Sequence, residues 1–397
     1  MKKMLLALAA TTMLAGSAVA ASHSPVKIGV ILGFTGPLES ITPAMGAGAE
    51  LAMKEVSDSG KLLGGAAVES VRGDSTCVDA AAATAAAERL ATSDGVKAIM
   101  GADCSGVTGA ILQSVARPNG IVMVSPSATS PGLSTAEDDG LFFRTAPSDA
   151  RQGEIVRDIL VGKGVKSIAI SYTNNDYGKG LADSIKANFE GAGGTVTISA
   201  AHEDGKGDYA AEVGALAQAG GEVLVVAGYL DQGGKGIIQG ALDTGAFDVF
   251  YLPDGMVGDA IAEAIGAGLD KSYGANPGTD SPGAAKFQEM AAAAGFNGTS
   301  AFSAESYDAA ALIMLAMQAA GSADSSALKE KIMDVANAPG EQIFPGELAK
   351  GLEILAGGGD IDYVGASAVE LIGPGESAGN YREVAFKDGK IVVVGYR

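Results

Sequence analysis

Tryptophan is absent from this 397-residue sequence, and histidine and cysteine occur only twice each. Metal centres built from several histidines, cysteine-rich zinc sites and iron–sulfur clusters therefore lack their usual ligands. Basic residues are also few, because 27 lysines and arginines stand against 47 aspartates and glutamates, for a formal net charge of −20. A partner bound mainly through its phosphates would require the opposite balance. We therefore expect no metal, no cofactor and no nucleic-acid partner.

Long apolar runs are also missing, apart from a short one close to the N-terminus. Two lysines precede an apolar stretch over residues 4–15, and Ala18 and Ala20 flank a valine in the pattern that signal peptidase cleaves. The stretch is shorter than the roughly 20 residues that span a bilayer, which argues against a membrane anchor. The sequence therefore predicts a cleaved signal peptide over residues 1–20 and a mature protein in the oxidising periplasmic space.

The two cysteines, Cys77 and Cys104, each follow a strand-like run, over residues 67–74 and 97–102. Both would then lie at the carboxyl ends of neighbouring parallel strands, which makes a disulfide between them sterically reasonable. The alternative is two free thiols, one of them a nucleophile. Because exported proteins rarely keep an even pair of cysteines reduced, we interpret the pair as a disulfide.

The chain is long and apolar enough for two lobes, with 47% hydrophobic residues and a length beyond the roughly 100 to 200 residues of one domain. Short runs rich in valine and isoleucine alternate with alanine-rich stretches of helical spacing, which is typical of βαβ units on a parallel sheet. This pattern occurs twice. The strand-like runs are 26–33, 67–74, 97–102 and 121–125 in the first series, and 167–172, 195–201, 223–229 and 250–252 in the second. Helices are expected at 42–59, 79–92, 178–190, 209–219 and 233–244.

Two breaks divide this pattern. Residues 144–149 interrupt the periodicity with a threonine, a proline and a serine, which indicates a crossing segment, and residues 275–282 contain two prolines. A helix-only stretch over 283–335 and a tail of short strands over 361–394 follow, so we expect the chain to return to both lobes.

The predicted fold class is α/β, with two doubly wound parallel-sheet lobes joined by three crossing segments and a ligand cleft between the lobes. The expected N-terminal lobe comprises residues 21–147 plus about 276–358. The expected C-terminal lobe comprises residues 148–275 plus about 359–397.

In open parallel sheets, ligands bind in the crevice beyond the carboxyl ends of the strands, so the residues after each run are the candidates. Ser105, at a predicted helix start, and Thr129 offer donors to a carboxylate without a fixed positive charge. Prolines hold the loop after the fourth run extended and leave the carbonyls and hydroxyls of Ser127, Ala128 and Thr129 exposed. With the carboxylate of Asp254, these acceptors suit an ammonium group. The set predicts an α-amino acid as ligand.

Aromatic and apolar residues at other strand ends would surround the side chain of the ligand. Phe34, Tyr229 and Met256 are candidates for this contact, and Tyr177 is a candidate for closing over the ligand. Each assignment has a plain structural alternative, because the hydroxyl groups also suit helix capping and Asp254 also suits a turn before Gly255.

Enzymes built on the same pattern carry motifs that this chain lacks. The turn over residues 33–37 does not have the G-x-G-x-x-G spacing of dinucleotide sites, and Pro37 removes an amide donor. His23 and His202 are expected to be solvated surface residues, since no G-x-S-x-G elbow accompanies them. A regulator would carry a helix-turn-helix before the first lobe. We therefore expect a monomeric, freely diffusing binding protein without enzymatic activity; a soluble accessory to a separate sensor is the alternative.

Several short motifs occur together: Ile28-Gly29-Val30 with Thr35-Gly36-Pro37, the cysteine pair, residues 101–105 and 125–129, Asp176-Tyr177-Gly178 and Gly228-Tyr229. In this combination the chain, from about residue 26 onward, resembles the periplasmic branched-chain amino acid binding proteins of ABC transporters, also called type I periplasmic binding proteins. The resemblance implies that Ser105 and Thr129 hold a ligand carboxylate. It also implies that Ser127, Thr129 and an acidic residue hold the ammonium. Tyr229 would contact the ligand from the second lobe, and membrane permease subunits would be the partner.

Two positions depart from the pattern of that family. Asp254 stands where leucine-type binders have a glutamate before glycine, and Ile41 where they often have an aromatic ring. Both changes alter the depth of the pocket, so leucine, isoleucine or valine is the default ligand. Amides, urea and other small polar metabolites are the alternatives.

Overall fold

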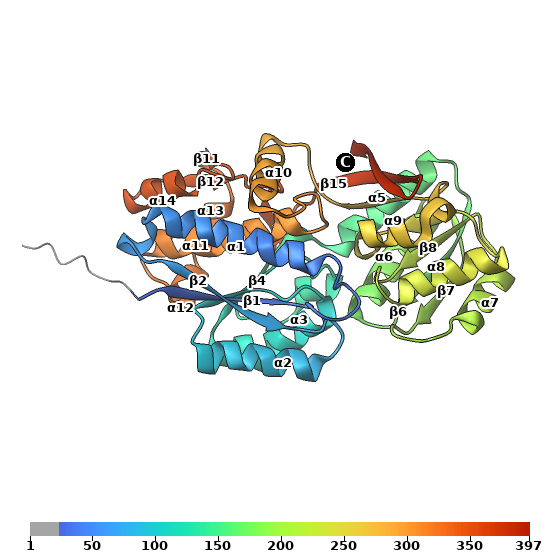
Figure 1. Cartoon of the computed structure of the whole chain (residues 1–397), viewed down its shortest axis with the longest axis horizontal. Helices are drawn as coiled ribbons and strands as arrows, with labels where there is room; N and C mark the ends of the chain where they lie inside the picture. The colour runs from blue at the N-terminus through green and yellow to red at the C-terminus, as the bar shows by residue number, and fades with distance from the viewer. Residues whose placement is uncertain (1–23) are drawn as a thin grey trace, which may run out of the picture.

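A computed structural model describes residues 24–397 and shows two α/β lobes side by side (Figure 1). The predicted signal peptide lies outside the described residues. Within residues 24–397, none of the helices combines the length and the apolar character that crossing a membrane requires.

The first lobe is built on a seven-stranded sheet in the order β13-β14-β5-β4-β3-β1-β2. Its strands are β1 (Val26–Leu32), β2 (Val68–Asp74), β3 (Ala98–Gly101), β4 (Val122–Ser125), β5 (Phe142–Pro147), β13 (Leu371–Ile372) and β14 (Glu376–Ser377). The strands β1 to β5 all pair in parallel. Because helices cover both faces of such a sheet, β3 and β4 are buried throughout, and all their residues are apolar except Ser125 at the end of β4.

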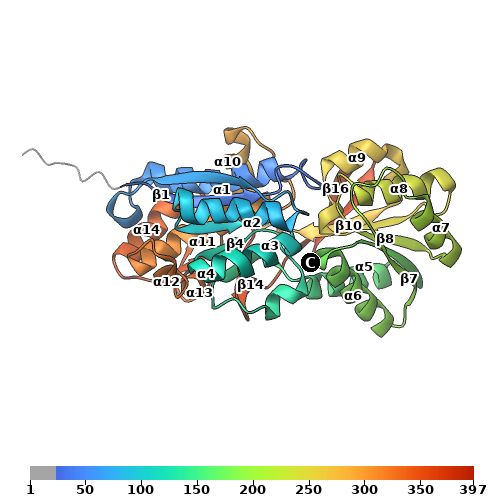
Figure 2. The ribbon, with the colours of Figure 1, turned by 90° about the horizontal axis from the view of Figure 1, so that it is seen from below.

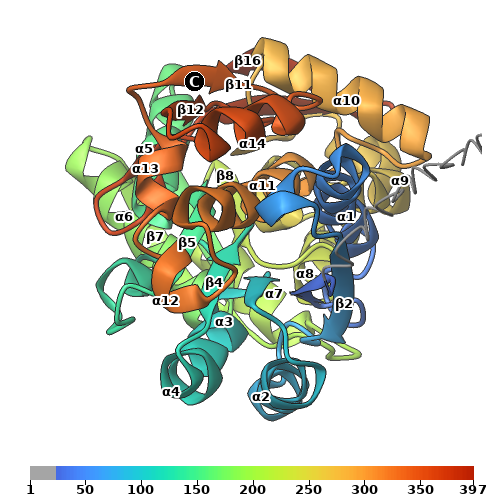
Figure 3. The same cartoon turned by 90° about the vertical axis from the view of Figure 1, so that its left-hand side faces the viewer.

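Helices form a layer on each face of this sheet (Figure 3). The helices α1 (Thr42–Ser59) and α11 (Ser303–Ala320) pack on each other over one face. The helices α2 (Ala80–Glu88) and α3 (Ser105–Ile111) cover the other face. Most residues of α11 are buried, which explains why the helix is apolar all round over residues 309–317 rather than amphipathic.

The second lobe repeats this order in a seven-stranded sheet, β16-β15-β10-β9-β8-β6-β7. Its strands are β6 (Ser167–Thr173), β7 (Thr195–His202), β8 (Val223–Ala227), β9 (Phe250–Leu252), β10 (Tyr273–Pro277), β15 (Tyr381–Lys387) and β16 (Lys390–Tyr396). The helices are α5 (Asp149–Gly162), α6 (Asp176–Gly191), α7 (Ala210–Ala219), α8 (Gly233–Thr244) and α9 (Asp259–Ile265). The predicted fold class, two doubly wound lobes, is confirmed.

The structure corrects the first expected crossing segment. Residues 144–149 are not a loop as a whole, because β5 extends to Pro147 and all its residues are buried. Its aromatic start, Phe142 and Phe143, is buried, and the proline lies at the end of the strand, where the pairing with β14 shifts register. The chain crosses at Ser148, whose hydroxyl caps α5 by accepting from the amide of Ala150 at 3.3 Å. The second crossing follows β10, after Pro277.

The structure also moves the last boundary, which the sequence placed near residue 359. Several further elements come before the boundary that the structure shows. They are the helices α10 (Pro282–Ala294), α12 (Ser325–Leu328), α13 (Ile332–Ala336) and α14 (Leu348–Ala356) and the small sheet of β11 (Glu341–Ile343) and β12 (Ile361–Tyr363). The strands β13 and β14 then join the first sheet, and only β15 and β16 join the second (Figure 2). The third crossing therefore lies between Ser377 and Tyr381.

Candidate functional site

A narrow cavity lies where the strand ends of both lobes face each other. The strand order reverses between β1 and β3 in the first lobe and between β6 and β8 in the second, and ligands of such sheets bind at this reversal. The cavity is tight, with about 10 Å³ of room for the centre of a water molecule. Its lining residues are Leu38, Asp103, Cys104, Ser105, Ser127, Tyr177, Tyr229, Asp254, Gly255 and Phe302. Both lobes therefore contribute to one site.

Two serine hydroxyl groups lie on the wall that the first lobe provides. Ser105 is the first residue of α3, and its Oγ accepts a hydrogen bond from the amide of Ser130 at 3.1 Å. Its hydroxyl hydrogen stays available for a ligand. Ser127 is 8% exposed and donates to the carbonyl of Asp103 at 3.0 Å. Both serines are thus held by their neighbours in fixed positions on the wall.

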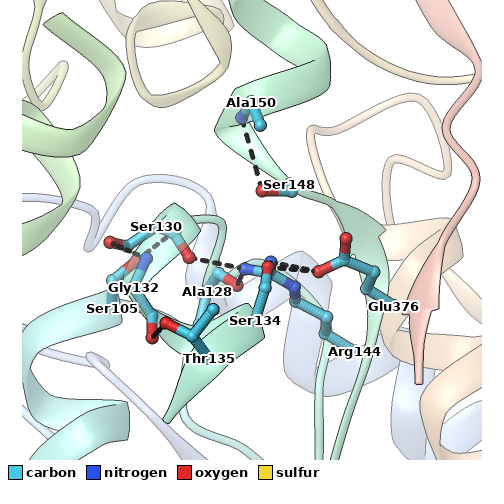
Figure 4. Close-up of polar contacts among 10 residues, drawn as sticks. All are labelled: Ser105, Ala128, Ser130, Gly132, Ser134, Thr135, Arg144, Ser148, Ala150 and Glu376. Atoms are coloured by element: carbon cyan, nitrogen blue, oxygen red, sulfur yellow. Dashed lines mark hydrogen bonds and ion pairs between the residues drawn. The ribbon is translucent and has the colours of Figure 1, made fainter. Parts of the chain in front are cut away.

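The loop that carries Ser127 is shaped by Arg144 (Figure 4). The guanidinium is 1% exposed and donates to the carbonyls of Ala128 and Ser130, each at 2.9 Å. On its other side it donates to Ser134 Oγ at 2.7 Å and to Glu376 Oε2 at 2.5 Å. A buried arginine thus satisfies the carbonyls of the loop and attaches the tail strand β14 to the first lobe.

The wall of the second lobe combines a carboxylate with two tyrosines. The hydroxyl of Tyr177 donates to Asp254 Oδ1 at 2.7 Å, and the amide of Gly255 donates to the same oxygen at 2.8 Å. The rings of Tyr177 and Tyr229 are stacked, with centroids 5.2 Å apart. Burial raises the pKa of Asp254, and these two hydrogen bonds oppose that rise.

Glycine is required beside this carboxylate. A Cβ atom on Gly255 would lie 2.7 Å from both the carbonyl oxygen of Gly228 and the hydroxyl of Tyr177. The small residue allows the turn that holds Asp254 to pack directly against the tyrosine.

A second acidic residue, Asp103, lines the cavity but already has partners for both oxygens. The amide of Gly33 donates to Oδ2 at 2.9 Å, and the hydroxyl of Ser75 donates to Oδ1 at 2.8 Å. Burial raises its pKa, and these hydrogen bonds lower it. Asp103 therefore ties the ends of the strands together rather than offering a free acceptor to a ligand.

Cys77 and Cys104 form the expected disulfide, with Cα atoms 5.1 Å apart. Within residues 24–397, these two cysteines and Asp103 are the group whose ligand atoms lie close enough together to hold a metal ion. Both sulfurs are in the disulfide, however, so neither is a free thiolate. The bridge fixes the loop that ends in Ser105 to the end of β2.

We expect the double variant Cys77→Ala, Cys104→Ala to lower the free energy of unfolding by about 3 to 4 kcal/mol, because the bridge restricts the unfolded chain over a separation of 27 residues. Urea denaturation of the parent and the variant measures this difference. Equal midpoints and slopes would contradict the stabilising role.

The structure brings five predicted ligand residues together in the cavity: Ser105, Ser127, Tyr177, Tyr229 and Asp254. Three further residues that were predicted to contact the ligand do not line the cavity. Phe34 does not line the cavity; the Arg72 guanidinium lies 4.9 Å from its ring centroid and α1 packs against the ring at Gly46. The carbonyl of Ala128 accepts from Arg144, and Thr129 is fully buried behind the cavity.

The apolar residues Met256 and Ile41 also lie outside the cavity, because their side chains pack against neighbouring elements. Met256 is fully buried and packs against Gly234, and Ile41 lies against Gly258 at a separate groove between the lobes. Leu38 lines the cavity in their place. His202 is not a surface residue: it is 1% exposed, bonded through Nδ1 to Ser171, and burial lowers its pKa to about 4.

Sequence reasoning missed Phe302 altogether. It lines the cavity from the start of α11, 177 residues after residue 125, where the first series of strand-like runs ends. Its backbone is left-handed, with φ of 60°. No local pattern identifies such a residue. Asp103 was missed too, but its position directly before Cys104, at a predicted strand end, could have identified it.

A wider groove runs between α7 and α8 on the second lobe. Its lining comes from that lobe alone, so a ligand there would have no contact with which to draw the lobes together. The interlobe cavity is therefore the better candidate. It offers two buried acidic groups, of which Asp103 is held by Gly33 and Ser75, together with neutral donors and no lysine or arginine among its lining residues, an arrangement suited to a small zwitterion.

Known proteins match this chain over most of its length. The family described as periplasmic binding protein matches residues 25–347. The Leu/Ile/Val-binding protein homolog 1 of Brucella abortus (strain 2308) is 33% identical over 336 residues, which cover 82% of this chain and 86% of that protein.

Solved structures show the same fold. The branched-chain amino acid transporter substrate binding protein of Streptococcus pneumoniae, in complex with isoleucine, has a TM-score of 0.76 at 22% identity and covers 94% of this chain and 99% of its own. A solute binding protein of an ABC transporter from R. palustris, in complex with benzoate, has a TM-score of 0.76 at 20% identity and covers 94% and 96%. On the strength of the family match and the curated relative, this chain belongs to the periplasmic binding protein family, among the Leu/Ile/Val-binding proteins.

Proposed function

We propose that this protein captures an L-amino acid with an aliphatic side chain in the interlobe cavity and delivers it to the permease subunits of an ABC transporter. The ligand is bound and released without chemical change. The protein works as a monomer in the periplasm, which its export by the predicted signal peptide would provide.

The observation that carries this proposal is the buried carboxylate of Asp254 in a cavity without basic side chains. A ligand with a carboxylate alone would meet repulsion there, whereas an ammonium would gain a charge-assisted hydrogen bond. The carboxylate of the ligand would be held by neutral donors from the first lobe, of which Ser105 is the foremost. Leu38 and Phe302 supply an apolar surface for an aliphatic side chain.

Capture is coupled to closure because the two charged ends of the ligand bind different lobes. The open form is favoured without ligand, and contacts from both walls favour the closed form, which docks to the permease. A molecule that touched only one lobe would have no preference between the two forms.

The test is a thermal-shift screen of the mature protein, unfolded and refolded to remove retained ligand, against L-amino acids, amides, urea and small carboxylates. Selective binding raises the apparent melting temperature by mass action. Calorimetric titration of the positive compounds then gives the affinity. We expect leucine, isoleucine or valine to bind. Stabilisation only by compounds without an α-ammonium would overturn the amino-acid assignment.

A second prediction concerns Ser105. We expect Ser105→Ala to weaken binding of L-leucine by about 1 to 3 kcal/mol, because the variant removes a hydrogen bond to a charged group. Calorimetry measures the change in Kd. Thr84→Ala is the matched control, since that exposed hydroxyl bonds only to its own helix, at the carbonyl of Ala80. An unchanged Kd in Ser105→Ala would remove Ser105 from the carboxylate site.

A further inference from the structure

A direct contact between the lobes lies beside the cavity, away from the three crossing segments. It joins the loop after β1, residues 33–41, to the loop after β8, residues 228–232. The amide of Ser40 in the first lobe donates to Asp231 Oδ2 in the second lobe at 2.9 Å. In return, the amide of Asp231 donates to the carbonyl of Pro37 at 3.2 Å. We call these two hydrogen bonds the Asp231 contact.

The first lobe has no acidic group of its own at the place where Asp231 binds. The start of α1 faces the second lobe (Figure 1), and its N-cap residue, Ile41, has a side chain that cannot accept a hydrogen bond. The first turn of α1 contains no acidic residue either. A helix of 18 residues favours a negative charge near its N-terminus, where backbone amides lack partners within the helix. Asp231 therefore supplies, from the second lobe, a charge that this helix start lacks.

The carboxylate of Asp231 is half-buried, and its bonding partner lies across the cleft. Within residues 24–397, the hydrogen bonds to this carboxylate come from Ser40. Two other charges act on it, because Lys235 of α8 attracts the carboxylate and Glu39 of the first lobe repels it. Its hydrogen bonding thus holds the two lobes together and does not tie elements of the second lobe to each other.

The Asp231 contact is connected to the cavity wall on both sides. Leu38, which lines the cavity and is 4% exposed, lies between the two first-lobe residues that bind Asp231. The amides of Ile41 and Thr42 both donate to the carbonyl of Leu38, at 3.0 and 3.2 Å, so this segment is a fixed turn. Tyr229, two residues before Asp231, lines the cavity from the other side. A bond to this turn therefore fixes the position of Leu38 relative to the second lobe.

We propose that Asp231 is a positioning residue for ligand capture, which binds the turn of Leu38 when the lobes close and holds that side chain against the ligand. The inference rests on the proposed function and adds to it a residue that does not line the cavity. Opening of the lobes breaks both hydrogen bonds of the Asp231 contact, so the contact stabilises the closed form alone. A more stable closed form releases its ligand more slowly.

The first experiment measures release of L-leucine. We expect Asp231→Ala to raise the dissociation rate by about 5- to 30-fold, because it removes a hydrogen bond to a charged group that solvent partly screens. The association rate is expected to change little, since most effects of such substitutions appear in dissociation. Release of tritiated leucine into an excess of unlabelled leucine measures the rate.

The ligand-free protein separates positioning from a merely structural role. Refolded Asp231→Ala without ligand is expected to melt at the temperature of the parent, because the Asp231 contact contributes nothing to the open form. Asp248→Ala is the matched control, an exposed aspartate of the second lobe that pairs with Lys271 of the same lobe. This control is expected to release leucine at the rate of the parent.

A double-mutant cycle tests the link to Leu38. If Asp231 acts by holding Leu38, its removal matters less once that side chain has been shortened. In the background of Leu38→Ala we therefore expect Asp231→Ala to accelerate leucine release by only about threefold or less.

Each outcome distinguishes the positioning role from the proposed function. Release from Asp231→Ala at the rate of the parent would overturn the positioning role and leave amino-acid capture standing. Equal acceleration with and without the Leu38 side chain, or a lower melting temperature of the ligand-free variant, would also overturn it. Failure of the parent to bind leucine would overturn both. If Asp231→Ala does not fold, Asp231→Asn, which keeps the size of the side chain, decides by the same measurements.

Discussion

Asp254→Asn is expected to raise the Kd for L-leucine by about 30-fold to several thousand-fold, the largest effect of any single substitution in the cavity. This range corresponds to about 2 to 5 kcal/mol, the usual cost of removing one partner of a buried, hydrogen-bonded charge pair. Asparagine keeps the size of the side chain and an acceptor for Tyr177, so the loss reports the charge rather than the shape. Calorimetric titration of the refolded variant measures it.

The comparison ligand for this variant is 4-methylpentanoate, which is leucine without its ammonium. Its affinity is expected to stay the same or to improve in Asp254→Asn, because the variant removes a repulsive charge. Asp243→Asn, an exposed position of α8, is the control and should change neither Kd. If both ligands lost affinity equally in Asp254→Asn, the carboxylate would not be the ammonium acceptor.

Arg144→Met is expected to lower the free energy of unfolding by about 3 to 5 kcal/mol, because it removes the counter-charge of Glu376, which keeps only the hydroxyl of Ser134, and the buried donor of the carbonyls of Ala128 and Ser130. Urea denaturation followed by circular dichroism measures the change. The double variant with Glu376→Met should lose less, since it removes the unpaired charge as well.

The matched control is Arg151→Met, an arginine in an exposed pair with Glu154 at 2.8 Å, for which the expected loss is below about 1 kcal/mol. Equal midpoints for Arg144→Met and Arg151→Met would show that the buried ion pair does not stabilise the first lobe. Because Arg144 also shapes the loop of Ser127, leucine binding by Arg144→Met should be weaker than by the control.

The second lobe illustrates how much of the site followed from local pattern. Tyr177 ends the segment that follows the strand-like run 167–172, Asp254 stands two residues after the run 250–252, and parallel strands place their carboxyl ends on one edge. That geometry is general, so a sequence position translates into a place in the cleft. The same reasoning applies to Ser105 and Ser127 in the first lobe, and the structure places all four on the cavity wall.

The same local pattern failed where a neighbouring element decides the orientation of a side chain. Phe34 follows β1 as predicted, but it turns toward Arg72 and α1 because these groups offer it a packing surface. Thr129 was assigned to the ligand, yet it lies against Asp149, which the sequence did not single out. Strand ends predict the edge on which a residue lies, not the direction in which it points.

Taken by itself, the sequence determined the α/β class and the repeated strand and helix pattern, because both depend on the local period of apolar residues. It also determined the pairing of the two cysteines, because each has only the other as a partner. Only the tertiary structure decided that Phe302 lines the cavity, that β13 and β14 return to the first lobe, and that Arg144 pairs with Glu376. These features join residues far apart in the chain through packing and buried charge. Such contacts have no signature in the sequence near any one of the residues that make them.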